Sequence, residues 1–205
     1  MKKTISREEL ERIKKIRGEI RGVILKTDIS FITRKSGKGS LEKIESRMKQ
    51  LGYPFKYSEI KLLKFYPIRL RVISLLVMKE VLGFSDEQIR EMGAQVPKDF
   101  FVLRLSMSLL GFAKDPKKLY ENAPGVWKKF ITIGEFIVPK FEEKAGRGRV
   151  IDRIKDFKIH PILCTYLLGI LAHFHEIARR VERVDVQELK CPFKGDEYHE
   201  FLMRW

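Results

Sequence analysis

The chain has few of the residues that form disulfide scaffolds or histidine-based sites. Its 205 residues include two cysteines, Cys164 and Cys191, and four histidines, the first of which is His160. Two cysteines are too few for a disulfide framework, so we expect free thiols in a reducing, cytoplasmic compartment. The N-terminal residues are charged throughout and contain no apolar run, so we predict no signal peptide.

The motifs of common enzyme families are also missing. There is no Gly-x-Ser-x-Gly elbow, no dinucleotide fingerprint and no His-Glu-x-x-His pair. The segment RKSGKGS at residues 34–40 superficially resembles a phosphate loop, but it lacks the first glycine of the Walker pattern. Acidic pairs such as Glu142-Glu143 lie in charged turns that are typical of solvated surface. We therefore predict that the protein is not an enzyme.

Long hydrophobic runs are scarce as well. The longest one, residues 159–174, is shorter than the ~20 residues that cross a bilayer. It also contains Pro161, Cys164 and two histidines. We predict a buried helix here and no membrane span.

Positive charge is the strongest bias of the composition. The formal net charge is +15 and the isoelectric point is about 9.8. Such a field attracts nucleic acid or an anionic membrane surface. The lysines, however, are spread along the chain and interleaved with glutamates, a composition typical of proteins from hyperthermophiles. No recognised nucleic-acid-binding motif accompanies the charge, so nucleic acid is a less favoured partner.

The first part of the chain, residues 1–133, reads as helical. Capping boxes at Ser6 and Ser85 mark two helix starts, and Pro67 marks a kink or a fresh start. The segment 22–31 is apolar and β-branched, so periodicity leaves strand and helix both open. Pro97 is predicted to break the helix that follows Ser85. The predicted helices cover residues 6–21, 41–51, 58–82, 85–94, 100–110 and 115–130.

From Gly134 onward the pattern changes to two strands, a helix and two strands. The predicted fold class is α+β: an N-terminal helical part, then a ββαββ unit forming a four-stranded antiparallel sheet with one long helix packed on it. The unit covers residues 134–205, with no linker before it, so we expect a single compact unit over 1–205. Its elements are strands 134–141 and 149–157, helix 160–181, and strands 184–192 and 197–205.

The last hairpin carries candidate metal ligands. Gly195 lies midway between Cys191 and His199, so a tight turn there sets these two residues opposite each other. Alternation along the last strand puts His199 on the buried face. Cys164 comes close if helix 160–181 packs on that face. Glu188 reaches the same ion only if a bulge near Cys191-Pro192 shifts the register.

These residues carry a resemblance to a known family. The line HPILCTYLLGILAHF … VQELKCPFKGDEYHEFLMRW, within residues 159–205, resembles the C-terminal signature of the 4-vinyl reductase domain family. Some members of that family sense phenolic compounds and hold zinc. The resemblance implies a closed structural zinc site with four protein ligands: Cys164, Glu188, Cys191 and His199. The usual last ligand is cysteine, and histidine is a replacement that zinc accepts.

The helical start followed by ββαββ also resembles a broader group, which includes heme-based nitric-oxide sensors and TRAPP-type vesicle-tethering subunits. Heme ligation in those sensors needs a histidine in the helical part. Since no histidine precedes His160, we expect no heme. His173 and His175 lie two residues apart on the predicted helix and are expected at the surface or as capping residues.

The function predicted from these features is a small-molecule-binding or sensing module with structural zinc. We expect a homodimer, a small apolar or aromatic ligand held between the helical part and the sheet, and a separate signalling partner. Trp127, Phe130 and Phe136 are candidate pocket residues, although their spacing is more typical of core. The alternative is an interaction or scaffold module with buried acyl chains. A basic nucleic-acid-binding protein is the third hypothesis.

Overall fold

The structure is a computed structural model that describes residues 4–99 and 116–205. It confirms the predicted α+β architecture, with helices first and a ββαββ unit after them. The first part contains α1 (Arg7–Lys14), β1 (Glu19–Arg21), α2 (Gly22–Lys26), α3 (Asp28–Ser36), α4 (Ser40–Gln50), β2 (Phe65–Pro67), α5 (Ile68–Val77) and α6 (Asp86–Asp99). The second part contains α8 (Pro116–Phe130), β3 (Glu135–Lys144), β4 (Arg147–Lys155), α9 (Pro161–Arg179), β5 (Asp185–Lys190) and β6 (His199–Arg204).

The first helix is shorter than predicted. Its capping box is present, since the Ser6 hydroxyl accepts the Glu9 N–H at 3.1 Å. The helix nevertheless ends at Lys14, and β1 pairs with β2 in a small antiparallel sheet. Gly18 adopts a φ of +94°, a conformation that glycine tolerates and that ends helical geometry. The undecided segment 22–31 is helical and forms α2 and the start of α3.

The central helix begins later than predicted, and the next one ends later. Pro67 precedes the first residue of α5, as a fresh start requires, while residues 58–66 are not part of that helix. The second capping box is confirmed, because Ser85 and Gln88 exchange hydrogen bonds of 2.9 and 3.2 Å. The prediction that Pro97 breaks α6 was wrong, since the helix runs to Asp99. A proline removes one backbone hydrogen bond, a loss that a helix packed against another can tolerate. The predicted helix 100–110 lies outside the described residues.

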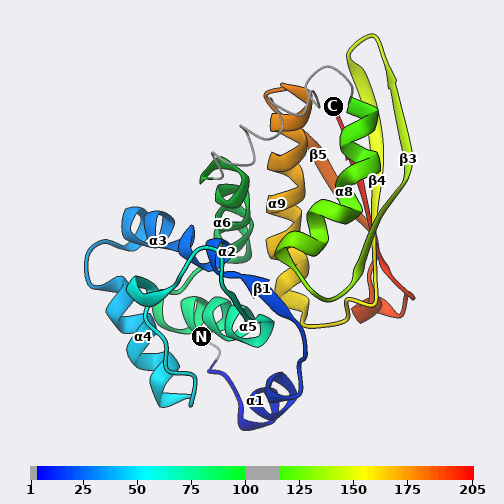
Figure 1. Ribbon diagram of the computed structural model, residues 1–205. Helices are drawn as coiled ribbons and strands as arrows, with labels where there is room; N and C mark the ends of the chain where they lie inside the picture. Colours follow the sequence, from blue (N-terminus) through cyan, green and yellow to red (C-terminus); the bar gives the residue numbers. More distant parts are fainter. Residues whose placement is uncertain (1–3, 100–115) are drawn as a thin grey trace.

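The four strands of the second part form one antiparallel sheet in the order β3-β4-β6-β5. Helices α8 and α9 cover one face of it, and α6 and α5 of the first part pack against α9 (Figure 1). Aligned residues of β4 and β6 point into this covered face, and Val150, Ile154, Phe201 and Met203 are each fully buried there. The core of the second part therefore lies between the sheet and α9.

Two glycines bring α6 and α9 into backbone contact. A Cβ at Gly169 would lie 1.9 Å from the carbonyl oxygen of Arg90, and one at Gly93 would lie 2.1 Å from that of Tyr166. Only glycine permits so close an approach at these two positions. By length and composition α9 is the one described helix that resembles a membrane span, and 44% of the relevant stretch is buried within this protein.

A buried ion pair ties the first part to α9. Arg71 of α5 donates to the carboxylate of Asp28 of α3, and both side chains are almost wholly buried. The ring of Tyr166, from α9, stacks against the guanidinium at 4.1 Å. These contacts place α9 between the helical part and the sheet, so side chains from both parts reach it.

Candidate functional site

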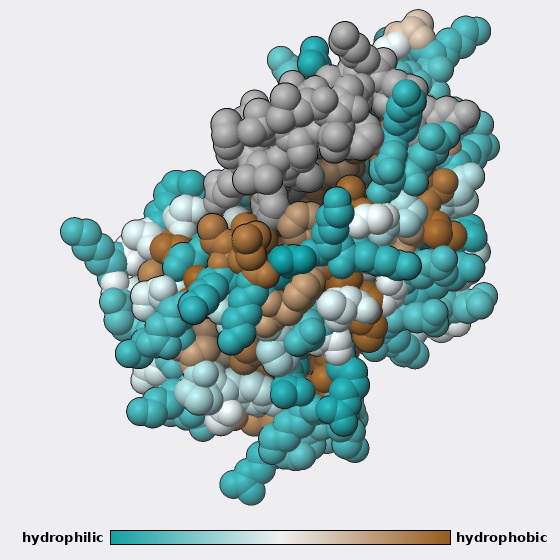
Figure 2. Space-filling view, in the orientation of Figure 1, coloured by the Kyte–Doolittle hydropathy of each residue, from teal (hydrophilic) through white to brown (hydrophobic). Residues whose placement is uncertain are grey.

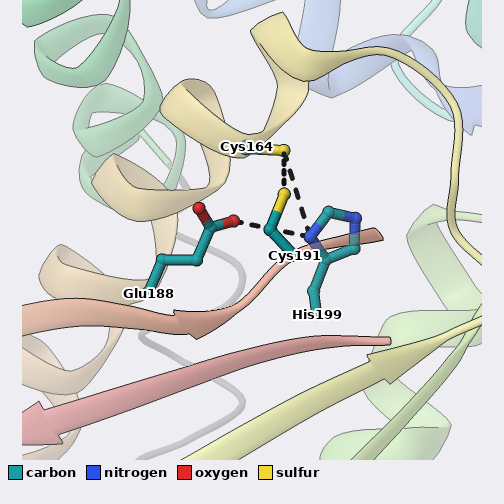
Figure 3. Close-up of side chains that lie close together, drawn as sticks. All are labelled: Cys164, Glu188, Cys191 and His199. Atoms are coloured by element: carbon teal, nitrogen blue, oxygen red, sulfur yellow. Dashed lines mark hydrogen bonds and ion pairs between the residues drawn. The ribbon is translucent and has the colours of Figure 1, made fainter. Parts of the chain in front are cut away.

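The four predicted metal ligands meet near the N-terminal end of α9. Cys164 comes from the first turns of that helix, Glu188 from β5, Cys191 from the residue after β5, and His199 from the start of β6. Figure 3 shows the four side chains turned toward one another. One ligand atom from each residue lies within 4.8 Å of the other three. We call these residues the metal cluster.

The hairpin geometry explains how the sequence achieves this convergence. Lys190 pairs with Glu200, a register that places Cys191 opposite His199, as the midpoint at Gly195 predicts. Between Glu188 and Lys190 the register shifts by one residue. This is the irregularity that Glu188 needs in order to face the same side as Cys191, and it lies slightly earlier than predicted.

The distances within the metal cluster are close to those of tetrahedral zinc. The Cys164 sulfur lies 3.9 Å from the Cys191 sulfur and 3.9 Å from Nδ1 of His199. Oε1 of Glu188 lies 3.5 Å from the same Nδ1. Zinc bonds of about 2.0–2.3 Å at tetrahedral angles separate ligand atoms by about 3.3–3.8 Å. The remaining separations, which reach up to 4.8 Å, would have to shorten by about 1 Å to complete the geometry.

Neighbouring groups leave the electron pairs of the cluster pointing inward. Nε2 of His199 lies 3.2 Å from the carbonyl oxygen of Phe157, so Nε2 carries the proton and Nδ1 presents its lone pair. Lys194 donates to Oε2 of Glu188 at 3.0 Å, whereas the buried Oε1 has no hydrogen-bond partner in the described chain. Burial raises the pKa of the Cys164 thiol, and Cys191 and Glu188 raise it further. A divalent cation would offset this crowding of acceptors.

A second feature of the covered sheet face is an apolar cavity of about 130 Å³, farther along α9. It lies between α8, α9 and the sheet. Trp127, Phe130 and Phe136, the candidate pocket residues, all line it, together with Leu167 and Leu171 of α9. Trp127 stacks on Phe136 with ring centroids 5.5 Å apart. The aromatic residues therefore surround a cavity in addition to contributing to the core.

Three polar residues form a chain at this cavity. Nδ1 of His175 lies 3.1 Å from the Tyr120 hydroxyl, and Nε2 lies 2.9 Å from Oδ2 of Asp152. Burial raises the pKa of Tyr120, and the Asp152 carboxylate raises it further, so the hydroxyl keeps its proton. With a neutral imidazole, Tyr120 donates to Nδ1 and Nε2–H donates to Asp152. Oδ1 of Asp152 is buried without a partner among the described residues.

The sequence analysis did not identify the hydrogen-bonded group of Tyr120, His175 and Asp152. The expectation that His175 lies at the surface or caps the helix was wrong, because its side chain is 1% exposed. The spacing of Leu167, Leu171 and His175, each four residues apart on the buried side of α9, could have revealed it. Asp152 lies between Val150 and Ile154 on the inward face of β4, an alternation that marks a buried acid.

Comparison with known proteins gives structural relatives only. No family model and no curated protein matches the chain. An H-NOX protein from S. oneidensis in the Fe(II) ligation state aligns with a TM-score of 0.62 at 11% identity, covering 90% of this chain and 95% of that one. The Fe(II) unliganded H-NOX protein from K. algicida gives a TM-score of 0.59 at 16% identity, with 90% and 95% covered. A structure described by heme redox potential and porphyrin distortion gives 0.54 at 15% identity, with 90% and 98% covered.

These relatives show a shared fold. They confirm the architecture expected from the broader group that contains heme-based nitric-oxide sensors, and the match covers 90% of this chain. The narrower resemblance to the 4-vinyl reductase domain family has no support from a family model. At 11–16% identity the common architecture does not identify the ligand of this chain.

The expectation of no heme is corrected by these comparisons, because proteins of this fold are named for heme and its iron. That expectation rested on a single ligation mode, a histidine of the helical part. In the described wall of the cavity the one histidine, His175, has both ring nitrogens in hydrogen bonds. As they lie, these residues do not fit a heme iron. An axial bond from His175 would require loss of its contact to Tyr120 or to Asp152.

Proposed function

We propose that this chain is a non-enzymatic, small-molecule-sensing module of the 4-vinyl reductase domain type with a structural zinc site. The ligand would occupy the apolar cavity, and zinc would hold the last hairpin against α9. The observation that carries the sensing role is one atom of Asp152, a residue of the cavity wall. Oδ1 of Asp152 is a buried acceptor without a described partner, in a wall that is otherwise almost wholly apolar.

This atom defines the chemistry of the ligand. An unsatisfied buried acceptor costs about 1–3 kcal/mol, a cost that a donor on the ligand removes. Small apolar cavities of about 150 Å³ accept molecules of the size of benzene. The cavity of about 130 Å³ therefore suits a small aromatic or apolar molecule with one N–H or O–H group.

The metal cluster supports a structural role for its ion. Its residues offer one ligand atom each, and together they would fill a tetrahedral sphere around zinc. A filled sphere leaves no position for a metal-bound water, so the ion would stabilise the fold and would not activate a nucleophile. Such an ion would join Cys164 of α9 to three residues of the last hairpin.

The cavity between α8, α9 and the sheet does not suit the scaffold alternative with a buried acyl chain. Drug-sized pockets measure about 300–1,000 Å³, and the described cavity is about 130 Å³. A long acyl chain would need further space that the packing of α8 and α9 against the sheet does not offer among the described residues.

Paired probes test the sensing role. Thermal denaturation with benzene and with phenol should show tighter binding of phenol, by about tenfold or more, because phenol donates to Asp152. Asp152→Ala should abolish this preference while leaving benzene binding. Ala123→Leu, which fills part of the cavity, should weaken both compounds. The sensing role fails if neither compound raises Tm at saturating concentration.

Heme is the second candidate occupant of the cavity, favoured by the names of the structural relatives. Hemin titration followed by absorbance distinguishes the two occupants. A bound-heme spectrum that is lost in His175→Ala would assign the cavity to heme and would overturn the proposal for a benzene-sized ligand. A spectrum of free hemin, identical in wild type and His175→Ala, would leave the cavity to the small ligand.

A further inference from the structure

Two neighbouring leucines on the link between α4 and β2 point into solvent. Leu63 is 77% exposed and Leu62 is 50% exposed, and among the described large hydrophobic residues only Leu189 is comparable. Figure 2 shows a molecular face that is mostly hydrophilic, with hydrophobic residues in small patches. We call residues 61–64 the leucine tip. An exposed pair of leucines on a charged protein calls for a functional explanation.

The leucine tip is held firmly, so its exposure is built into the fold. The carbonyl oxygens of Leu62 and Lys64 accept backbone N–H groups from Val23 and Gly22 at 3.0 and 2.8 Å. Arg21 donates to the carbonyl oxygen of Leu63 at 2.8 Å. A Cβ at Gly22 would lie 2.2 Å from the Lys61 carbonyl oxygen, so glycine is required for this approach. These contacts hold the backbone of the tip and leave both leucine side chains uncovered.

Cations surround the leucines. Lys61 and Lys64 flank them directly, and the guanidinium of Arg21 lies over the Phe65 ring at 4.3 Å. Arg21 donates to the carbonyl oxygens of Leu63 and Lys129, which are neutral. Within residues 4–99 and 116–205, no carboxylate forms an ion pair with Arg21, Lys61 or Lys64. The tip therefore combines exposed apolar groups with uncompensated positive charge.

We propose that the leucine tip docks the protein on an anionic lipid surface. Leu62 and Leu63 enter the boundary between headgroups and acyl chains, while Lys61, Lys64 and Arg21 contact lipid phosphates. Lysine stems extend along such a boundary with their charged ends in water. The net charge of +15 adds a long-range attraction to the same surface.

Other partners fit this tip less well. A stable protein interface buries about 800 Å² on each side, more than two leucine side chains and their neighbours supply. A second copy of the chain would also bring a second charge of +15 and repel the first. Nucleic acid would use the cations and leave the leucines in water. A lipid boundary is the partner that uses both.

Vesicle binding by the full chain tests the proposal. Sedimentation with phosphatidylcholine vesicles should recover little protein. Vesicles in which about 30% of the lipid is phosphatidylglycerol should recover most of it at low salt. Leu62→Ser/Leu63→Ser should weaken binding to anionic vesicles by about tenfold or more. Lys61→Gln/Lys64→Gln should weaken it and reduce its salt dependence.

Matched variants separate the tip from general charge. Leu189→Ser removes the other exposed leucine, and Lys38→Gln/Lys43→Gln removes two exposed lysines elsewhere. Both should bind as wild type does. The proposal is overturned if wild type ignores anionic vesicles, if it binds neutral vesicles equally, or if the tip variants bind as well as the controls. A tip that captured only an acidic protein would give the first of these results. Unchanged Tm in every variant confirms that folding is intact.

Discussion

His175 of α9 and His199 of β6 are both buried, but different groups surround their ring nitrogens. His199 is wholly buried with sulfurs and a carboxylate around Nδ1, and the only donors that the cluster can offer this nitrogen are weak thiol S–H groups. His175 is 1% exposed, and a hydroxyl and a carboxylate pair with its two nitrogens. Both rings lie between the same helix and the same sheet. Burial is therefore equal, and what differs is the balance of donors and acceptors.

That balance indicates what each histidine is for. Where sulfur, carboxylate and imidazole acceptors converge away from water, a divalent cation would offset their mutual repulsion, which supports the proposed zinc site. Donors and acceptors that alternate are stable alone, so the Tyr120–His175–Asp152 chain requires no ion. Its one surplus acceptor, Oδ1, belongs to Asp152, a residue that lines the cavity, and this acceptor is the basis of the proposed contact with a ligand donor. The donors and acceptors around each ring distinguish these two sites, which a search for buried histidines alone would group together.

Removing the metal should produce the largest effect. Protein purified without a histidine tag should contain about one zinc per chain, and Cys191→Ser should contain almost none. Structural zinc contributes several kcal/mol to folding, and about 1 kcal/mol shifts Tm by about 2–4 °C at this chain length. We therefore expect Tm to fall by about 10 °C or more in the variant. Elemental analysis and calorimetry measure both quantities.

Chelation supplies the control for that experiment. With the metal removed from both proteins, wild type and Cys191→Ser should melt at nearly the same temperature, because both then lack the same link between α9 and the hairpin. Well-folded wild type without bound metal would remove the contrast between the two histidines. Cys164, Cys191 and His199 would then be core residues.

Disrupting the Tyr120–His175–Asp152 hydrogen bonds should lower the free energy of unfolding by less than loss of the metal does. His175→Ala leaves the buried Asp152 carboxylate without its hydrogen-bond partner, a loss of about 1–3 kcal/mol. His173→Ala is the matched control, since His173 lies two residues away on the same helix and is only partly buried. Its loss should stay below about 1 kcal/mol. Denaturant unfolding of both variants, without ligand, measures the difference. Equal losses would show that the chain contributes no more than a surface contact.

Sequence reasoning found the metal cluster because local patterns encode it. Alternation along β6 gave the inward face of His199, and the midpoint at Gly195 gave its register with Cys191. Even the bulge before Cys191 followed from the odd spacing to Glu188. Glu188, Cys191 and His199 lie on one hairpin, so their geometry depends on few long-range contacts, whereas Cys164 joins them only because α9 packs on the same face.

The cavity could not be found in the same way. Tyr120, Asp152 and His175 come from three different elements, and only packing brings them together. The three-residue strands β1 and β2 also pair across a long interval, which local periodicity does not report. The capping boxes and the ββαββ order were predictable because each depends on neighbouring residues. The partners of His175 depend on where α8 and α9 settle.

Replacing Glu188, the carboxylate of the metal cluster, should have a smaller effect, which we expect to see in zinc affinity. Glu188→Gln keeps the size of the side chain and removes the charge that balances the ion. Loss of a mere supporting contact around a metal costs about 10–100-fold in affinity, so a ligand substitution should cost at least about tenfold. Glu182→Gln, at an exposed position, is the control and should bind zinc as wild type does. Competition with a chromophoric chelator measures affinity. Equal affinities would place Glu188 outside the coordination sphere.

The smallest effect should come from the lysine that orients this carboxylate. Lys194 donates to Oε2 of Glu188 at 3.0 Å, and the same contact raises the pKa of Lys194. Lys194→Met should reduce zinc affinity by less than about tenfold, because Glu188 keeps its place on β5 and loses only one orienting bond. The side chain of Lys194 is 69% exposed, so salt should screen the contact and shrink the difference from wild type. Lys190→Met, which removes a lysine bonded to Tyr198, should leave affinity unchanged. A salt-independent loss in Lys194→Met would mean that the variant disturbs the turn itself, and a loss as large as that of Glu188→Gln would mean that Glu188 cannot reach the ion without it.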